Sequence, residues 1–467
     1  MIARHTSPFC GSWYPGQAPE LRRLLTSLEE TSEERTGSGF LPSPLAFVVP
    51  HAGLAYSGAV AQAAFRYLRH SPPERVWLLG FSHSGACAAV ATTDVAAYCT
   101  PLGDVQVDSQ KLPFPRLQEA RLCDHSVEIQ LPLLRSQAPG AHIIPLYVGC
   151  LSPAERRRAA QQLANLYRPG DVFVASSDFT HFGRNFGYVP FPVDTSTAQR
   201  IADLDQRLID AAASVDAGYF LSEIDRTEST TCGREPIALL LETLSLLPGV
   251  EVFQVALDYQ TSGQLTGDFS HSVSYAALGY FPAESFALPK EEQRLLLQSA
   301  FDTLSSLYST GERRLVPPAL RPAAFQRRIG AFVTLYQNDE LRGCIGHMHP
   351  VKPLGELIPE LALSAALDDP RFSHAPLPPA ETRVEISLLT PPKPVADVSG
   401  FVLHRHGVML EQGGRRGLLL PQVAHEYHLT REQFLHALAR KAGLDWERLK
   451  PDYRLAVFRS TRFSAPV

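Results

Sequence analysis

The sequence predicts an α/β domain followed by an α+β domain, and three observations lead to this prediction. The chain has 467 residues, and a prior of about 100–200 residues per domain favours two cores. Between Leu45 and Tyr280, apolar runs alternate with helical patterns, as in a largely buried α/β sheet. Two prolines and several acids interrupt this alternation near residues 281–293, and hairpin patterns follow. We therefore predict domains at 1–285 and 286–467.

The first domain is expected to open its sheet with PLAFVVP (44–50), followed by the alanine-rich helix SGAVAQAAFRYLRH (57–70). A second strand, RVWLLGFSH (75–83), repeats this strand-to-loop pattern. Further expected strands are HIIPLYVG (142–149), DVFVASS (171–177), VEVFQVALDY (250–259) and SVSYAALGYF (272–281), and SPAERRRAAQQLANLY (152–167) is an expected helix. The domain is therefore expected to hold a central sheet flanked by helices.

The second domain is expected to begin with the amphipathic helix EEQRLLLQSAFDTLSSLY (291–308). GAFVTLYQNDELRGCIG (330–346) reads as two strands joined by the polar turn QNDE. The other expected elements are strands in VEISLLTPP (384–392) and GVMLEQGGRRGLLLP (407–421), and helices in LGELIPELALSAAL (354–367) and REQFLHALARKAGL (431–444). Strands and helices in this order predict an α+β domain.

The composition excludes several classes of protein. A hydrophobic fraction of 45% and a charged fraction of 19% are typical of an ordinary globular protein, which argues against disorder. The net charge of -5 comes without long blocks of like charge, so we expect no nucleic-acid or membrane partner. No apolar run approaches the roughly 20 residues that span a bilayer. The expected partners are small molecules or proteins.

The N-terminus and the cysteines favour a cytoplasmic location. The opening MIARHTSPFCGSWYPG has no apolar core followed by small residues, so it does not resemble a secretory signal. Seven cysteines, an odd number without a CxxC pair, fit a reducing compartment better than a disulfide framework. Each cysteine is therefore expected to be a free thiol or a metal ligand.

Two histidines follow expected strands in the same way. His51 comes directly after PLAFVVP, and His83 ends the run RVWLLGFSH. Strand-end loops of α/β sheets commonly carry functional groups, so these two side chains can converge. A single histidine in such a loop is more often hydrogen-bonded to its own turn. The repetition of the pattern favours a shared pocket.

Cys232 in ESTTCGREPIALLLETL precedes a helix expected to begin at about Gly233 or Arg234. A helix N-terminus lowers the pKa of a thiol and favours the thiolate, which is the form that binds metal. An inert buried cysteine in a capping turn is the competing interpretation.

Two acid and histidine pairs add to this half of the chain. Asp178 and His181 in SSDFTHFG follow an expected strand, where the imidazole could transfer protons or support a ligand. His125 and Glu128 in HSVEIQLPLL are three residues apart and would share a helical face. Structural or surface roles remain open for both pairs.

These residues lie in motifs that resemble the MEMO family, the protein B component of AmmeMemoRadiSam systems. GSWYPG, PHAGLAYSG, GFSHSG, DHSVEIQLP, SSDFTHFG, TCGREPI and SVSYAA occur in the order expected of that family over about residues 1–282. The resemblance implies a fold like the catalytic subunit of class III extradiol dioxygenases, which use non-heme Fe(II). It also implies a pocket formed by two histidines and a cysteine.

Carried over by motif, the resemblance makes His51, His83 and Cys232 the expected metal ligands. His181 is similar to the acid–base histidine of the dioxygenases, and its neighbour Asp178 is expected to tune it. These two are the expected catalytic residues. The wall of the pocket would then include Tyr56 of PHAGLAYSG, His125 and Glu128.

The sequence departs from the family pattern in ways that bear on the metal. Leu54, Ala55, Phe81 and Ser84 differ from the residues expected in pocket walls. Compared with the dioxygenases, a cysteine replaces a carboxylate ligand, and a soft thiolate makes Cu(I) and Zn(II) alternatives to Fe(II).

The second half resembles the AMMECR1 family, protein A of the same systems, over about residues 290–467. The matching motifs are GAFVTL, LRGCIG, DDPRF, VEISLLTPP, HGVML, GLLLPQVA and FLHALARKAGL. The name of the system implies a radical SAM enzyme as partner. The chain itself has no CxxxCxxC motif, so we expect no iron–sulfur cluster.

LRGCIG offers a possible second site. Arg342 could bind an anion and Cys344 could be a nucleophile, although catalysis by a thiol needs a base or a lowered pKa. His347 and His349 are near in sequence only. A structural turn built on Gly343 and Gly346 is the favoured interpretation. In DDPRF, Asp369 is likewise expected to cap the chain or pair with Arg371 while Phe372 packs.

Three functions follow from these residues. The first is a non-heme-iron redox protein or dioxygenase-like enzyme that acts on an unknown small molecule. The second is a metal-binding or partner-binding adaptor without turnover. The third is a zinc hydrolase, in which three protein ligands leave a position for water.

Overall fold

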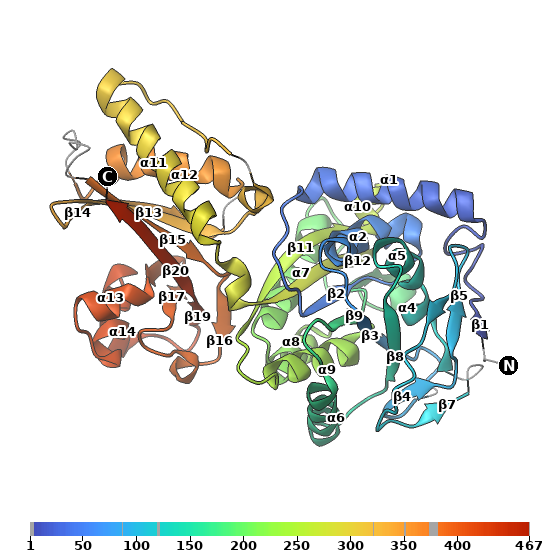
Figure 1. The fold of residues 1–467 in the computed structure, drawn as a ribbon. Helices are drawn as coiled ribbons and strands as arrows, with labels where there is room; N and C mark the ends of the chain where they lie inside the picture. Colours follow the sequence, from blue (N-terminus) through green and yellow to red (C-terminus); the bar gives the residue numbers. More distant parts are fainter. Residues whose placement is uncertain are drawn as a thin grey trace. The chain divides into compact units, whose positions relative to one another are not determined.

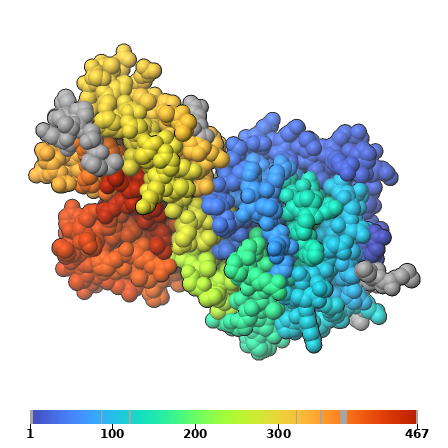
Figure 2. All heavy atoms as spheres, in the orientation of Figure 1, coloured from blue at the N-terminus to red at the C-terminus, as the bar shows by residue number. Residues whose placement is uncertain are grey.

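Two structural units divide the chain in the computed structural model, which describes residues 4–85, 87–118, 122–320, 322–349, 352–372 and 382–466. One unit takes the N-terminal part up to Gly37 and then Pro42–Pro282, and the other takes Ser38–Leu41 with the residues from Ala283 onward. Figure 1 shows the elements of each unit, and Figure 2 shows the heavy atoms of the chain in the same orientation and colours. The α/β and α+β classes predicted for the two halves are confirmed.

The first unit is built on a large mixed sheet. Within the described residues its strand order is β10-β12-β2-β9-β3-β8-β4-β7, and β11 pairs with β12. The strands are β2 (Ala46–Val49), β3 (Arg75–Phe81), β4 (Val90–Thr93), β7 (Arg116–Leu117), β8 (His142–Val148), β9 (Val172–Ser176), β10 (His181–Gly183), β11 (Val252–Thr261) and β12 (His271–Pro282). The central strands β2, β9, β3 and β8 are parallel, and β12 and β4 flank them in antiparallel pairing. All six strands that the apolar runs of this half predict lie in this sheet, as β2, β3, β8, β9, β11 and β12.

Helices cover both faces of this sheet (Figure 1). One layer contains α1 (Ala18–Thr36), α2 (Leu54–His70) and α5 (Leu131–Gln137), and the other contains α6 (Pro153–Leu166), α7 (Thr197–Ala213), α8 (Ala217–Thr227) and α9 (Arg234–Ser245). The alanine-rich α2 is buried nearly throughout because it lies between the sheet and α1. Ser152 caps the N-terminus of α6, and its hydroxyl and Glu155 form a capping box. Apolar residues on α2 and α9 thus bury the sheet on both sides.

A short turn of helix and a small sheet complete the first unit. α4 (His125–Glu128) begins at Asp124, whose carboxylate accepts the Ser126 N–H. It packs so closely on β3 that a Cβ at Gly80 would lie 2.6 Å from Val127 Cγ2, so glycine is needed there. The small sheet contains β1 (Arg4–Thr6), β5 (Ala97–Cys99) and β6 (Val105–Gln106). A short helix α10 (Ser262–Thr266) connects β11 to β12.

The second unit contains two antiparallel sheets of the order β14-β13-β15-β20 and β16-β19-β17-β18 within the described residues. The strands are β13 (Gly330–Gln337), β14 (Glu340–His347), β15 (Thr382–Leu389), β16 (Lys393–Val395), β17 (Gly407–Gln412), β18 (Arg415–Leu419), β19 (Arg454–Phe458) and β20 (Ser460–Pro466). Its helices are α11 (Lys290–Thr310), α12 (Leu354–Leu367), α13 (Pro421–Glu426) and α14 (Arg431–Lys441). The expected turn between β13 and β14 is present: Asn338 and Asp339 have φ values of 49° and 64°, as a tight hairpin turn requires.

No helix in the described part of the chain is both long enough and apolar enough to cross a membrane.

A buried ion pair fixes the start of β3, the strand that leads to His83. The guanidinium of Arg75 and the carboxylate of Asp171 are both almost fully buried and hydrogen-bonded to each other. Trp77 Nε1 also donates to Asp171 at 3.0 Å. The Asp171 carboxylate therefore compensates a buried cation and satisfies a buried indole.

We expect Asp171→Asn to lower the free energy of unfolding by about 3–5 kcal/mol, because it leaves the buried Arg75 charge without its counter-ion. Chemical denaturation of the full chain measures this. Asp104→Asn is the control, since Asp104 pairs with Arg4 in an exposed position and its loss should change stability little. Equal stability of the two variants would contradict the role assigned to Asp171.

Candidate metal centre

The candidate centre lies where three neighbouring parallel strands end. β2, β9 and β3 lie side by side in that order, so their carboxyl ends meet at one edge of the sheet. His51 follows β2 by two residues, Asp178 follows β9 by two, and His83 follows β3 by two. This edge is where open α/β sheets bind ligands. The strand order explains why the two histidines converge.

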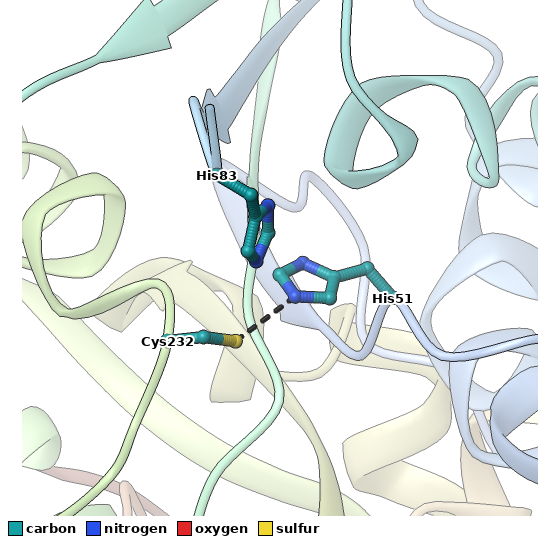
Figure 3. Close-up of side chains that lie close together, drawn as sticks. All are labelled: His51, His83 and Cys232. Atoms are coloured by element: carbon teal, nitrogen blue, oxygen red, sulfur yellow. Dashed lines mark hydrogen bonds between the residues drawn. The ribbon is translucent and has the colours of Figure 1, made fainter. Parts of the chain in front are cut away.

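His51, His83 and Cys232 are brought together at this edge. Their ligand atoms all lie within 4.8 Å of one another. His51 Nε2 lies 2.9 Å from Cys232 Sγ, and Figure 3 shows both imidazole rings and the thiol directed toward one point. The geometry therefore offers two nitrogens and one sulfur to a single ion.

Hydrogen bonds hold the His51 ring with Nε2 toward the cysteine. Asp178 Oδ1 accepts the backbone N–H of His51 at 2.8 Å. His51 Nδ1 lies 3.1 Å from Ser176 Oγ, and Gln130 donates to the same hydroxyl at 3.0 Å. When Nδ1–H donates to this hydroxyl, Nε2 carries the lone pair that a metal needs. Burial of His51 lowers its pKa, which keeps the ring neutral.

Asp124 holds His83 in the corresponding way. Asp124 Oδ1 lies 2.9 Å from His83 Nδ1, and Oδ2 accepts the His83 backbone N–H at 3.1 Å. Burial opposes ionisation of this carboxyl, but the hydrogen bond from His83 and the charge of His125 lower its pKa to about 2. His83 Nε2 is therefore left for a ligand. The His83 side chain is one-third exposed, whereas His51 is buried, so the centre opens on the His83 side.

His125 completes the group of imidazoles. Its ring stacks on His83 with centroids 4.1 Å apart and meets the His51 ring edge-on at 5.2 Å. Burial lowers the pKa of His125 to about 4, although the charge of Asp124 opposes this. The ring is therefore neutral near pH 7 and lines the centre as expected.

The loop that carries Cys232 approaches β9 very closely. A Cβ at Gly233 would lie 2.4 Å from Ser177 Cβ, and the Gly233 N–H donates to Ser177 Oγ at 3.0 Å. Only glycine fits here. α9 begins at Arg234, as expected, but the expected lowering of the thiol pKa is wrong for the metal-free pocket. Burial and the nearby charge of Asp178 raise the pKa of Cys232, and they outweigh the helix N-terminus.

Asp178 and His181 lie near the centre in different roles. Burial raises the pKa of Asp178 to about 7, opposed by hydrogen bonds from the His51 and Ala52 backbone. His181 Nδ1 lies 3.1 Å from the Thr230 carbonyl, and burial lowers its pKa. A neutral imidazole with Nδ1 bonded in this way presents Nε2 as a proton acceptor.

Two further residues are expected in the wall of the pocket, and for Tyr56 this stays a prediction. Tyr56, in the first turn of α2, has half of its surface exposed. Glu128 is fully buried, with Oε1 at 3.0 Å from His5 Nε2. His125 and Glu128 of the short α4 therefore contact different partners, the imidazoles of His51 and His83 in one case and His5 in the other.

Sequence reasoning missed the residues that orient the imidazoles. Asp124 directly precedes His125 in DHSVE, and an aspartate before a short helical run is a cap signal that could have identified it. Ser176 ends β9 inside an apolar run, and Gln130 lies in an equally apolar segment. For these two, the sequence offers no comparable signal.

The LRGCIG motif of the second unit lies in strand β14, where Gly343 is buried and the other five residues of the motif are partly buried. Arg342 falls at the register shift where β14 departs from regular pairing with β13. Thr334 Oγ1 lies 3.2 Å from Cys344 Sγ, and burial raises the pKa of this thiol. His347 is three residues along the strand and points to the opposite face. This arrangement favours the structural interpretation of Cys344 over a nucleophile.

Comparisons with known proteins agree with this division of the chain. The family model described as Memo-like protein matches residues 4–279, which is more than half of the chain. This chain belongs to the Memo-like protein family. A second family model, AMMECR1, matches residues 297–463, so the Memo-like domain is fused to an AMMECR1 domain.

Curated relatives match this chain over most of their own length. Protein MEMO1 of Homo sapiens is 30% identical over 295 residues, which cover 59% of this chain and 97% of the relative. The memo-1 homolog of Caenorhabditis elegans is 31% identical over 290 residues, covering 57% and 79%. A solved structure of an uncharacterized protein from Pyrococcus horikoshii is 32% identical and covers 38% of this chain and 93% of its own, with a TM-score of 0.36.

Asp369 is the acid that holds the LRGCIG strand of the AMMECR1 domain. It pairs with Arg371 at 2.7 Å, as expected, and its Oδ2 accepts the Cys344 N–H at 2.8 Å. The hydrogen bond from Arg371 lowers the pKa of Asp369 from 3.8 to about 2, although burial opposes this. A folded-state pKa below the unfolded value stabilises the domain above about pH 4, and this contribution is lost as the pH falls toward 2.

We expect Asp369→Asn to lower the stability of the AMMECR1 domain at pH 7 by about 1–3 kcal/mol, because charged hydrogen bonds to Arg371 and Cys344 are lost. The difference from wild type should shrink between pH 4 and pH 2. Denaturation of the full chain at several pH values measures it, with the exposed Asp339→Asn as control. A difference that does not depend on pH would contradict the ionised role of Asp369.

Proposed function

We propose that the Memo-like domain binds Fe(II) through His51, His83 and Cys232 and acts as a non-heme-iron redox protein or dioxygenase-like enzyme on a small molecule. The observation that carries this proposal is the convergence of three ligand atoms within 4.8 Å, with both imidazoles held at Nδ1. Three ligands leave coordination positions for a substrate or dioxygen, and redox chemistry is what the iron would supply.

The surroundings of the three residues fit a cation. The imidazoles of His51 and His125 have lowered pKa values and are neutral, so they add no positive charge that would repel an ion. Asp124 stays ionised beside His83. The Cys232 thiol is the one group that must lose its proton on binding, and a bound cation makes that loss favourable. The same donors could hold Cu(I) or Zn(II), which remain the alternative metals.

His181 is the proposed proton carrier. Its Nδ1 is engaged by the Thr230 carbonyl, and its lowered pKa leaves the ring ready to accept a proton at Nε2. Asp178 positions His51 through the backbone bond at 2.8 Å instead of touching a substrate. Substrates would approach past His83, the most exposed of the three ligands.

An adaptor without turnover is the alternative function. The observation that favours it is the cysteine in the ligand set, because a soft sulfur ligand suits metal capture as well as oxygen chemistry. A radical SAM enzyme remains the proposed partner, since the chain joins the two families whose system is named after such an enzyme.

We expect His51→Ala, His83→Ala and Cys232→Ser each to lose about one equivalent of Fe(II) per chain under anaerobic conditions, since each removes a ligand from an open three-ligand site. Asp124→Asn should weaken the same binding about 10–100-fold, because His83 loses the group that orients it. Metal analysis and Fe(II) titration measure both effects. His181→Gln is the matched control, a pocket histidine whose substitution should leave the bound iron unchanged.

The outcomes separate the proposed functions. Bound iron with oxygen consumption that depends on a candidate substrate and falls in His181→Gln supports the enzyme. Bound iron without oxygen consumption across a broad panel supports the adaptor. Selective zinc retention with hydrolysis lost in His51→Ala supports a zinc hydrolase. Equal iron in the wild type and all three ligand variants would overturn the proposal itself.

A further inference from the structure

A second group of ligand-type side chains lies in the Memo-like domain, outside the centre of His51, His83 and Cys232. It contains His5, Cys123 and Glu128, whose ligand atoms all lie within 4.8 Å of one another. His5 Nε2 is 3.0 Å from Glu128 Oε1. His5 and Glu128 are buried, and Cys123 is partly buried. These are three different donor types at one point.

The fold assembles this group from two distant segments. β1 pairs in parallel with β5, which sets His5 opposite Tyr98 with the two rings edge-on at 5.3 Å. Cys123 precedes α4 and Glu128 is its last residue, and the Asp124 cap and packing on β3 hold this turn in place. An edge strand near the start of the chain is thus brought to the turn that also carries His125 of the first centre.

The buried carboxylate of Glu128 can accept a cation as a partner. Glu128 is 0% exposed, and among the described residues no hydrogen-bond donor reaches Oε2. Among the described residues, His5 contacts this carboxylate and Glu128 acts on Tyr14, Cys123 and Tyr147; none of these four is a lysine or arginine. A buried carboxylate without a permanent counter-ion is costly. A bound divalent cation would supply the missing charge.

We propose that His5, Cys123 and Glu128 form a second metal site, which takes Zn(II). One imidazole nitrogen, one thiolate sulfur and one carboxylate oxygen match the ligands of zinc. The mixture is too soft for Mg²⁺ or Ca²⁺ and too hard for Cu(I). The hydroxyl of Tyr98 lies 3.6 Å from Cys123 Sγ. This site fastens β1 to the turn at α4, and it is separate from the iron centre proposed above.

Zinc titration of the metal-stripped full chain tests this proposal. Cys123→Ser and the nearly isosteric Glu128→Gln should each lose about one equivalent of zinc and keep the equivalent bound by Cys232. Cys232→Ser should show the reverse, and the Cys123→Ser/Cys232→Ser double variant should bind none tightly. Cys150→Ser is the matched control, because Cys150 is an exposed thiol outside both groups. Titration with Co(II) reports the thiolate ligand directly through its charge-transfer absorption.

Alkylation of the wild-type chain gives a readout that needs no variant. Zinc should slow modification of Cys123 at least about tenfold while Cys150 reacts at an unchanged rate, because a metal-bound thiolate is a poor nucleophile. Equal zinc in wild type, Cys123→Ser and Glu128→Gln, or an unprotected Cys123, would overturn the second site. Loss of zinc in Cys123→Ser but not in Cys232→Ser would keep the second site and count against the first.

Discussion

The parallel pairing of β2, β9 and β3 is the constraint on which the candidate centre depends. Because these strands are neighbours and run in one direction, the loops after them carry His51, Asp178 and His83 to the same edge of the sheet. The backbone N–H of His51 then bonds to Asp178 across that edge. Cys232 joins them from a loop that passes so close to β9 that it needs Gly233. The helices on both faces bury the strands and keep this edge in place.

Burial keeps the candidate ligands of the pocket uncharged in the absence of a metal ion. It lowers the pKa of His51 and His125 and raises that of the Cys232 thiol, so two imidazoles and a protonated thiol face one another in the metal-free chain. Asp124 is the group that stays charged. Such a site binds metal with release of a proton, which couples occupancy to pH. The same turn that holds Asp124 carries Glu128 to the second group of ligands, so α4 links two places where a cation would be stabilised.

Much of the fold could be predicted from the sequence because its strands are apolar runs, such as RVWLLGFSH. Polar turns, such as QNDE between β13 and β14, mark where these runs end. His51, His83 and Cys232 were chosen from strand ends and from the MEMO resemblance, and the structure brings them together. Strand order could not be derived from local pattern, since a short apolar run does not specify its neighbours. For the same reason Glu128 was assigned to the wall of the pocket, whereas its partner His5 is more than a hundred residues away in sequence.

X-ray absorption at the iron edge of the Fe(II)-loaded chain tests the central claim most directly, because it identifies the ligand atoms themselves. The account predicts a first coordination shell with one sulfur and imidazole nitrogens, and loss of the sulfur signal in Cys232→Ser. A shell of oxygen and nitrogen alone in the wild type, or a sulfur signal that persists in Cys232→Ser, would contradict a centre built from His51, His83 and Cys232.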